Sequence, residues 1–234
     1  MAVQVEVSGA AQTAAGRTVF VYEAPVRLWH WINALAISVL AVTGYLIASP
    51  LPSQPGEASD NFLMGYIRFA HFAAAYVFAI GFVARAYWAL VGNHHARELF
   101  VPRLADREWW AGMRQELLWY AFIARQPRKY QGHNPLANLM MFLMVTLGSV
   151  FMIVTGFALY GEGGQAGHWA NVLFTTWVLP LFGQSQDVHT WHHLGAWMMV
   201  VFVIVHVYAA IREDIMSRQT MIGAIINGER TFRS

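Results

Sequence analysis

The stretch "HTWHHLGAWMMVVFVIVHVY" (residues 189–208) decides the fold, because it places four histidines in a run that otherwise has the composition of a membrane-spanning helix. His192 and His206 lie fourteen residues apart in it. At about 100° and about 1.5 Å per residue, this interval brings both imidazoles to nearly one face, about 21 Å apart along the axis. Such a helix presents one histidine near each surface of a membrane.

The composition of the whole chain agrees with a membrane environment. Hydrophobic residues make up 57% of the 234 residues and charged residues 12%, against about 45–50% and about 25% in soluble domains. Cysteine is absent, which excludes disulfides, thiolate zinc sites and cysteine-ligated iron–sulfur clusters from this chain. Glycine-rich nucleotide-binding motifs are also missing, and no nucleic-acid partner is expected. Redox or transport chemistry in this chain therefore depends on histidine.

Four apolar segments have the roughly 20 residues that a helix needs to cross the bilayer core. They cover about residues 26–48, 62–91, 136–160 and 188–211. This predicts an all-α fold, an up-and-down transmembrane four-helix bundle spanning residues 20–234 after a flexible cytoplasmic tail at 1–19. Residues 109–124 are predicted to form a helix on the cytoplasmic surface, and residues 169–182, with Pro180, an interfacial or re-entrant helix. The similar segments "AVTGYLI" (41–47) and "IVTGFAL" (153–159) hint at a repeated helix pair.

The distribution of basic residues predicts the orientation of these spans. The loops at 49–61 and 161–187 contain no lysine or arginine, whereas both terminal segments and the 92–134 loop are rich in them. By the positive-inside rule, both termini are then cytoplasmic.

The depths of four histidines in the spans predict two cofactor sites. His30, near the start of the first span, and His206, near the end of the fourth, belong to the cytoplasmic layer. His71 and His192 belong to the outer layer. Ionisable residues in hydrocarbon are costly and usually functional, and histidine pairs facing each other across a four-helix bundle are typical of bis-histidine haems. We therefore predict two haems b, with iron ligand pairs His30/His206 and His71/His192.

Residues close to these histidines are candidates for the haem periphery. Arg27, Arg68 and Arg85 can pair with haem propionates, although positive-inside flanking equally explains Arg27. Gly44, fourteen residues after His30, leaves room for a macrocycle, although helix packing equally explains a glycine there.

The other histidines in loops and at helix ends are expected to have no ligand role. His94, His95 and His133 are predicted to be solvated, and His193 to point away from the His192–His206 face. From a different class of protein, a histidine-lined transition-metal transporter remains an alternative. A transporter is expected to cluster carboxylates or thioethers at one midplane site.

Several segments carry a resemblance to a known family. They are "APVRLWHWINALAISVLAVTGYLI" (24–47), "VGNHHAR" (91–97), "TWHHLGAWMMVVFVIVHVYAAIREDIMSRQTMI" (190–222) and "NGERTF" (227–232). Together they resemble the b-type cytochrome subunit of membrane-bound Ni/Fe hydrogenases, a di-haem family related to the cytochrome b subunits of formate dehydrogenase. The resemblance covers roughly residues 20–234 and implies the same four histidine ligands.

The resemblance also implies partners and a location. Electrons from hydrogen would arrive from the iron–sulfur clusters of a small subunit, whose C-terminal transmembrane helix packs beside the bundle, with the Ni/Fe large subunit behind it. They would leave to a membrane quinone, and the location would be the bacterial cytoplasmic (inner) membrane. Asn134 in "HNPLAN" (133–138) is the candidate quinone contact, although a helix cap before Pro135 would explain it too. A cytochrome subunit of the formate dehydrogenase or thiosulfate reductase type remains the nearest alternative.

Overall fold

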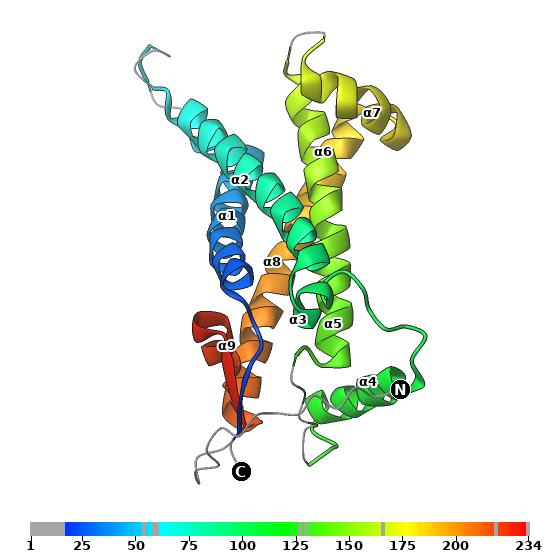
Figure 1. Ribbon diagram of the computed structural model, residues 1–234. Coiled ribbons are helices and arrows are strands. Elements are labelled where there is room, and N and C mark those ends of the chain that lie inside the picture. The colour runs from blue at the N-terminus through cyan, green and yellow to red at the C-terminus, as the bar shows by residue number, and fades with distance from the viewer. Residues whose placement is uncertain are drawn as a thin grey trace.

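The computed structural model describes residues 17–52, 55–57, 61–125, 128, 130, 132–164, 167–217 and 220–232. Within these residues, four long apolar helices form the body of the molecule, and short elements gather at its two ends (Figure 1). The predicted tail at 1–19 lies outside the described residues except for residues 17–19.

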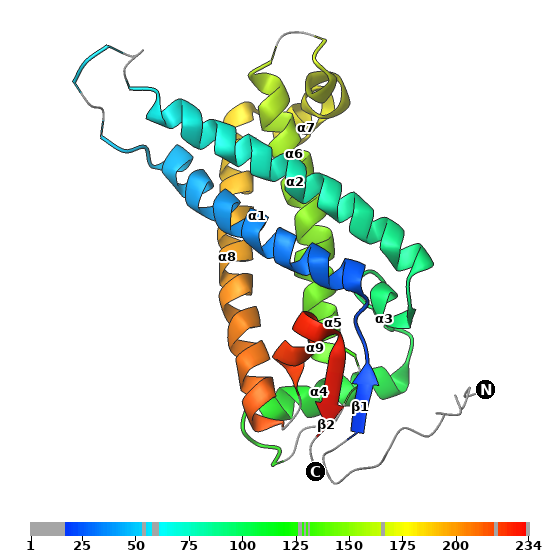
Figure 2. The same ribbon diagram turned by 60° about the vertical axis from the view of Figure 1, so that its left-hand side comes forward.

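The four long helices correspond to the four predicted spans. They are α1 (Ala24–Ala48), α2 (Leu63–Val91), a continuous helix made of α5 (Pro135–Met141), the π-helix η1 (Phe142–Gly148) and α6 (Ser149–Glu162), and α8 (Ser185–Met216). The shortest has 25 residues, which exceeds the roughly 20 residues that cross a bilayer core. Successive spans run in opposite directions along the bundle (Figures 1 and 2). The chain is thus a multi-pass membrane protein.

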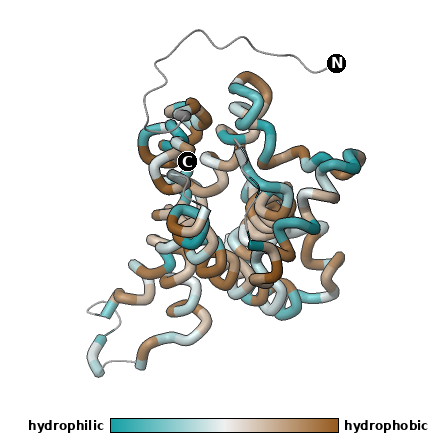
Figure 3. The backbone as a smooth tube through the Cα atoms, turned by 90° about the horizontal axis from the view of Figure 1, so that it is seen from below, coloured by the Kyte–Doolittle hydropathy of each residue, from teal (hydrophilic) through white to brown (hydrophobic). Residues whose placement is uncertain are grey.

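Large apolar side chains cover the outer surfaces of the spans. Phe69 is 72% exposed and Leu90 73%. Seen from below, hydrophobic residues recur throughout the tube of the bundle (Figure 3). A soluble monomer rarely exposes so large an apolar surface to water. In a membrane, lipid tails surround such a surface and keep it away from water.

All four spans contribute to the packed centre of the bundle. Ala36 of α1, Phe78 of α2 and Met199 of α8 form a buried cluster, and Met152 of α6 packs against it. This cluster fixes the spans relative to one another at mid-depth.

Several short elements from the terminal segments and from residues 92–134 gather at one end of the bundle. We call it the basic end, because these parts of the sequence are rich in lysine and arginine. They are α3 (His94–Arg97), α4 (Arg107–Tyr120), α9 (Met221–Asn227), β1 (Arg17–Phe20) and β2 (Glu229–Phe232). The two strands pair antiparallel, from Arg17 opposite Phe232 to Phe20 opposite Glu229. This small sheet corrects the all-α prediction. An even number of spans brings both terminal segments to the same end, where their backbones can pair.

The helix predicted on the membrane surface is α4, which lies across the basic end (Figure 1). Its last turn is fixed to α8, because Trp119 donates its indole N–H to Glu213 (2.8 Å) and Arg212 donates to the Trp119 carbonyl (3.0 Å).

The short apolar segment at the opposite end forms the π-helix η2 (Asn171–Thr175) and α7 (Thr176–Phe182). It is too short to span the membrane, as predicted. Thr175 ties it to α6 by donating a hydrogen bond to the Ala158 carbonyl at 2.7 Å.

Candidate functional site

The layer of histidines nearer the basic end is formed by α1 and α8. The ring centres of His30 and His206 lie 6.4 Å apart. A metal ion held by one nitrogen of each ring, at about 2.0–2.1 Å, places the ring centres roughly 6 Å apart. The measured separation therefore fits a bis-imidazole metal site, and we call this pair the inner layer.

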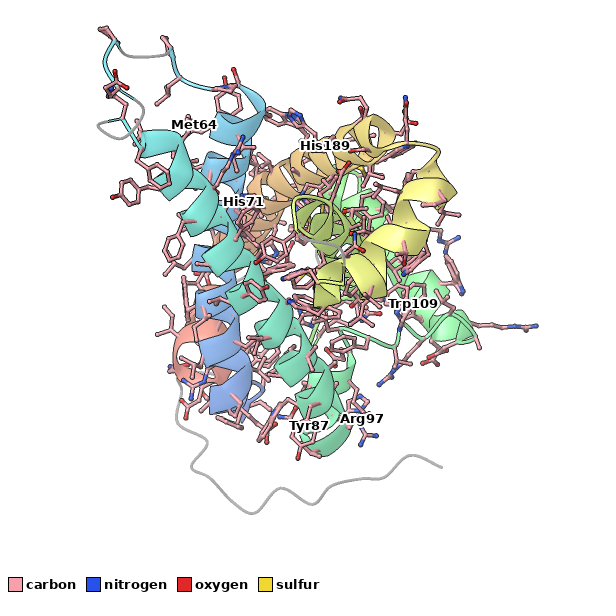
Figure 4. The ribbon with its side chains drawn as sticks, turned by 90° about the horizontal axis from the view of Figure 1, so that it is seen from above. Met64, His71, Tyr87, Arg97, Trp109 and His189 are labelled. Atoms are coloured by element: carbon pink, nitrogen blue, oxygen red, sulfur yellow. The ribbon has the colours of Figure 1, made fainter. Side chains whose placement is uncertain are left out.

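The second layer is formed by α2 and α8, and we call it the outer layer. Figure 4 looks down on this end of the bundle and labels His71 on α2. His71 and His192 lie close enough for charges on their rings to interact. The hydroxyl of Thr43 lies 2.9 Å from Nδ1 of His71, and the hydroxyl of Thr155 lies 2.8 Å from Nδ1 of His192. The structure thus places each predicted ligand pair at one depth.

The buried cluster at mid-depth separates the two layers. Met199 lies seven residues from both His192 and His206 on α8. At about 1.5 Å per residue, about 10 Å of helix lies between this cluster and each layer.

Arg85 is buried beside the inner layer, with 4% of its surface exposed. Its guanidinium stacks 5.5 Å from the ring centre of Trp29, next to His30, and donates to the Ala96 carbonyl at 2.8 Å. Within the described part of the chain, its Nε and Nη1 have no hydrogen-bond partner. Arg85 follows His71 by fourteen residues, just as His206 follows His192. A buried guanidinium with free donors fits a carboxylate such as a propionate.

The other predicted peripheral residues have different surroundings. Arg27 donates to the Ile226 carbonyl of α9 at 2.6 Å, and Arg68 is exposed on α2. Gly44 faces the outer layer, because a Cβ there would come within 3.3 Å of Cε1 of His71. Their roles toward haem stay predictions.

Two histidines predicted to be solvated bind a carboxylate instead. His95 donates from Nδ1 to Glu98 at 2.8 Å, and His133 donates its backbone N–H at 3.1 Å and Nδ1 at 3.2 Å. Burial alone would raise the pKa of Glu98, but the hydrogen bonds from His133 and His95 outweigh it and hold that pKa well below its usual range. The tertiary contact between α3 and the 132–134 segment creates this network, which the loop sequence did not indicate.

A cavity of about 400 Å³ adjoins this network at the basic end. His133 and Asn138 are among its lining residues, and His133 lies within electrostatic range of His206. Asn134, the predicted quinone contact, caps α5: its Oδ1 accepts from the Ala137 N–H at 2.7 Å, and its Nδ2 donates to Glu116 at 3.2 Å.

Glu116 of α4 is buried at the same end, with 1% of its surface exposed. Burial and the neighbouring Glu213 raise its pKa to about 7, against the opposing effect of Arg212 and Arg128. The folded state therefore binds a proton at this carboxyl more tightly than the unfolded chain does.

This proton binding predicts that stability falls as pH rises. The contribution of Glu116 is fully present below pH 4.5 and is lost as pH rises through about 7, by roughly 3 kcal/mol in total. Glu116→Gln should abolish this component in thermal melts of the detergent-solubilised protein between pH 5 and 8. The exposed Glu108→Gln on the same helix is the control. Equal pH dependence in the wild type and Glu116→Gln would contradict the expectation.

Two residues at the outer layer were missed by the sequence reasoning. Thr43 and Thr155 contact the outer histidines, and both lie in the repeated segments "AVTGYLI" and "IVTGFAL". The repeat was the available signal, but it gave no indication that its threonines face histidines on other helices.

The fold and the histidine pairs define a class of protein: a four-helix membrane cytochrome of the b type. Among the described residues, the four predicted ligand histidines lie as two opposed pairs, and no group of three or more histidine or acidic residues converges on a metal position. The profile of the family "Prokaryotic cytochrome b561" matches residues 21–228. The chain belongs to this family and, within it, to the B-type cytochrome subunits of Ni/Fe hydrogenases.

Three relatives illustrate the similarity. The "Probable Ni/Fe-hydrogenase B-type cytochrome subunit" of Cupriavidus necator is 63% identical over 217 residues, covering 93% of this chain and 88% of the relative. The protein of the same name from Azotobacter vinelandii is 63% identical over 215 residues, covering 92% and 89%. The "Probable Ni/Fe-hydrogenase 1 B-type cytochrome subunit" of Escherichia coli K12 is 49% identical over 218 residues, covering 92% and 91%.

Proposed function

We propose that this chain is the membrane-anchoring di-haem cytochrome of a respiratory uptake Ni/Fe hydrogenase and connects hydrogen oxidation to the quinone pool. His30 and His206 would hold one haem b, and His71 and His192 the other. A bis-histidine haem supplies one-electron transfer and leaves no coordination position for oxygen. The observation that carries the proposal is the 6.4 Å separation of the His30 and His206 rings across two spans.

The partners follow from the names of the relatives and from the division of chemistry between chains. This chain has no cysteine, so iron–sulfur clusters belong to a small subunit and the nickel–iron centre to a large subunit. The small subunit would dock at the outer layer and insert its C-terminal helix beside the bundle. The basic end would face the cytoplasm of a bacterium, with the spans in the inner membrane.

The quinone would be reduced near the inner layer. The cavity beside His133 supports this placement because it lies at the same end as the inner histidines. Asn134 already caps α5 and binds Glu116, so its contact with quinone would need one of those bonds to be exchanged.

The test is the haem content and substrate of the purified complex. We expect two haems b per chain by pyridine haemochrome assay, with reduced-minus-oxidised bands of the b type that develop under hydrogen but not with formate. One haem or none would contradict the di-haem proposal. Reduction by formate but not by hydrogen would favour the formate dehydrogenase type of subunit.

A further inference from the structure

Thr43 of α1 contacts the outer histidine of the neighbouring span. It is 8% exposed, and its hydroxyl donates to the Val39 carbonyl at 2.6 Å. A hydroxyl has one hydrogen to donate, so its oxygen is left to accept from Nδ1 of His71, 2.9 Å away. This arrangement selects the tautomer of His71 that carries its proton on Nδ1.

Thr155 of α6 repeats this arrangement at the other outer histidine. It is 1% exposed, its hydroxyl donates to the Phe151 carbonyl at 2.8 Å, and it lies 2.8 Å from Nδ1 of His192. Nδ1 of His192 therefore donates to Thr155, and Nε2 of that ring is left for a metal.

The glycine after each threonine completes the two contacts. A Cβ at Gly44 would lie 3.3 Å from Cε1 of His71, and a Cβ at Gly156 would lie 3.2 Å from Cε1 of His192. Both distances are tighter than ordinary contacts, so a larger residue at either position would need the imidazole to shift by a few tenths of an ångström. Each Thr-Gly pair thus makes the same set of contacts with one outer histidine.

In the described part of the chain, the threonine hydroxyls hydrogen-bonded to the predicted ligand histidines are those of Thr43 and Thr155, both in the outer layer. Within the described residues, Nδ1 of His30 is buried without a hydrogen-bond partner. The ring of His30 instead contacts Trp31, at 5.1 Å between ring centres, and His206.

We propose that Thr43 and Thr155 are positioning residues that fix the tautomer and orientation of the outer ligands and give the outer haem a lower reduction potential than the inner one. The inference rests on the proposed function. An acceptor for the Nδ1 proton makes a metal-bound imidazole more basic, and a more basic ligand stabilises the oxidised iron. The lower potential would lie where electrons are proposed to enter, so the difference favours transfer toward the inner layer.

Redox titration of the purified complex, followed at the haem bands, tests this inference. Thr43→Val and Thr155→Val remove the hydroxyl at nearly constant volume. Each should shift the lower of the two potentials to a more positive value, the double variant should shift it further, and the higher potential should stay constant. Thr43→Ser and Thr155→Ser, which keep the hydroxyl, should retain the wild-type value.

The control is Thr175→Val, which removes another buried hydroxyl whose hydrogen bonds within the described part of the chain go to the Ala158 and Ala170 carbonyls and not to a histidine. It should leave both potentials unchanged. If a valine variant loses the outer haem, the matching serine variant must restore both the haem and its potential, and failure to do so would overturn the inference.

The outcomes separate this inference from the proposed function. Unchanged potentials in the double valine variant, with two haems bound, would overturn the inference and leave the function standing. A wild-type complex with fewer than two haems, or a His71→Ala variant that keeps both, would overturn the ligand assignment itself.

Discussion

A His206→Ala variant, assembled with its hydrogenase, is expected to lose one of two haems and all hydrogen-dependent quinone reduction. The ring of His206 lies 6.4 Å from that of His30, and removing one of the two proposed axial ligands would leave the inner site unable to hold a low-spin iron. The remaining haem should still be reduced by hydrogen, because the outer layer is intact. Pyridine haemochrome assays and spectra under hydrogen measure both effects.

Artificial-dye reduction by the partner subunits should persist in this variant. That activity shows that the hydrogenase is assembled and active, so the loss is confined to the route through this chain. Normal quinone reduction by His206→Ala would mean that quinone takes electrons from the outer layer, and it would refute a quinone site at the basic end.

A His192→Ala variant is expected to lose the outer haem and to leave the inner haem unreduced by hydrogen. The layers are about 21 Å apart along α8, so without the outer haem the proposed donor in the small subunit would be too remote from the inner one. Dithionite should still reduce the remaining haem. His71→Ala should have the same phenotype, since His71 and His192 lie in the same layer.

His193→Ala is the matched control for His192→Ala. His193 is exposed and accepts a hydrogen bond from Trp197 on its own helix at 2.9 Å. The His193→Ala variant should retain both haems and full quinone reduction. Loss of a haem in His193→Ala, or two haems in His192→Ala, would show that the wrong histidine of the pair has been assigned.

The alternative of a metal transporter receives no support from the arrangement of side chains. The intramembrane histidines are divided between two layers, and a buried apolar cluster around Met199 lies between them. A transport path needs polar groups at mid-depth, where this bundle packs Ala36 against Phe78.

The sequence by itself predicted the four spans found among the described residues, their alternating directions and the spacing of the histidines along them, although α8 (Ser185–Met216) extends beyond the predicted 188–211 at both ends. These properties are local: hydropathy marks a span, and residue count along a helix measures depth at about 1.5 Å per residue. The fourteen-residue interval between His192 and His206 therefore sufficed to predict two layers before any contact was known.

Only the tertiary structure decided which groups surround the histidines. Thr43 lies 28 residues from His71, and Thr155 lies 37 residues from His192, so their bonds depend on how each helix is rotated toward its neighbour. The same holds for Glu98, which meets His133 across 35 residues, and for β1 and β2, which pair the two terminal segments. Sequence periodicity fixes the faces of a helix but not the partner that each face meets, because that choice depends on packing between all the spans at once.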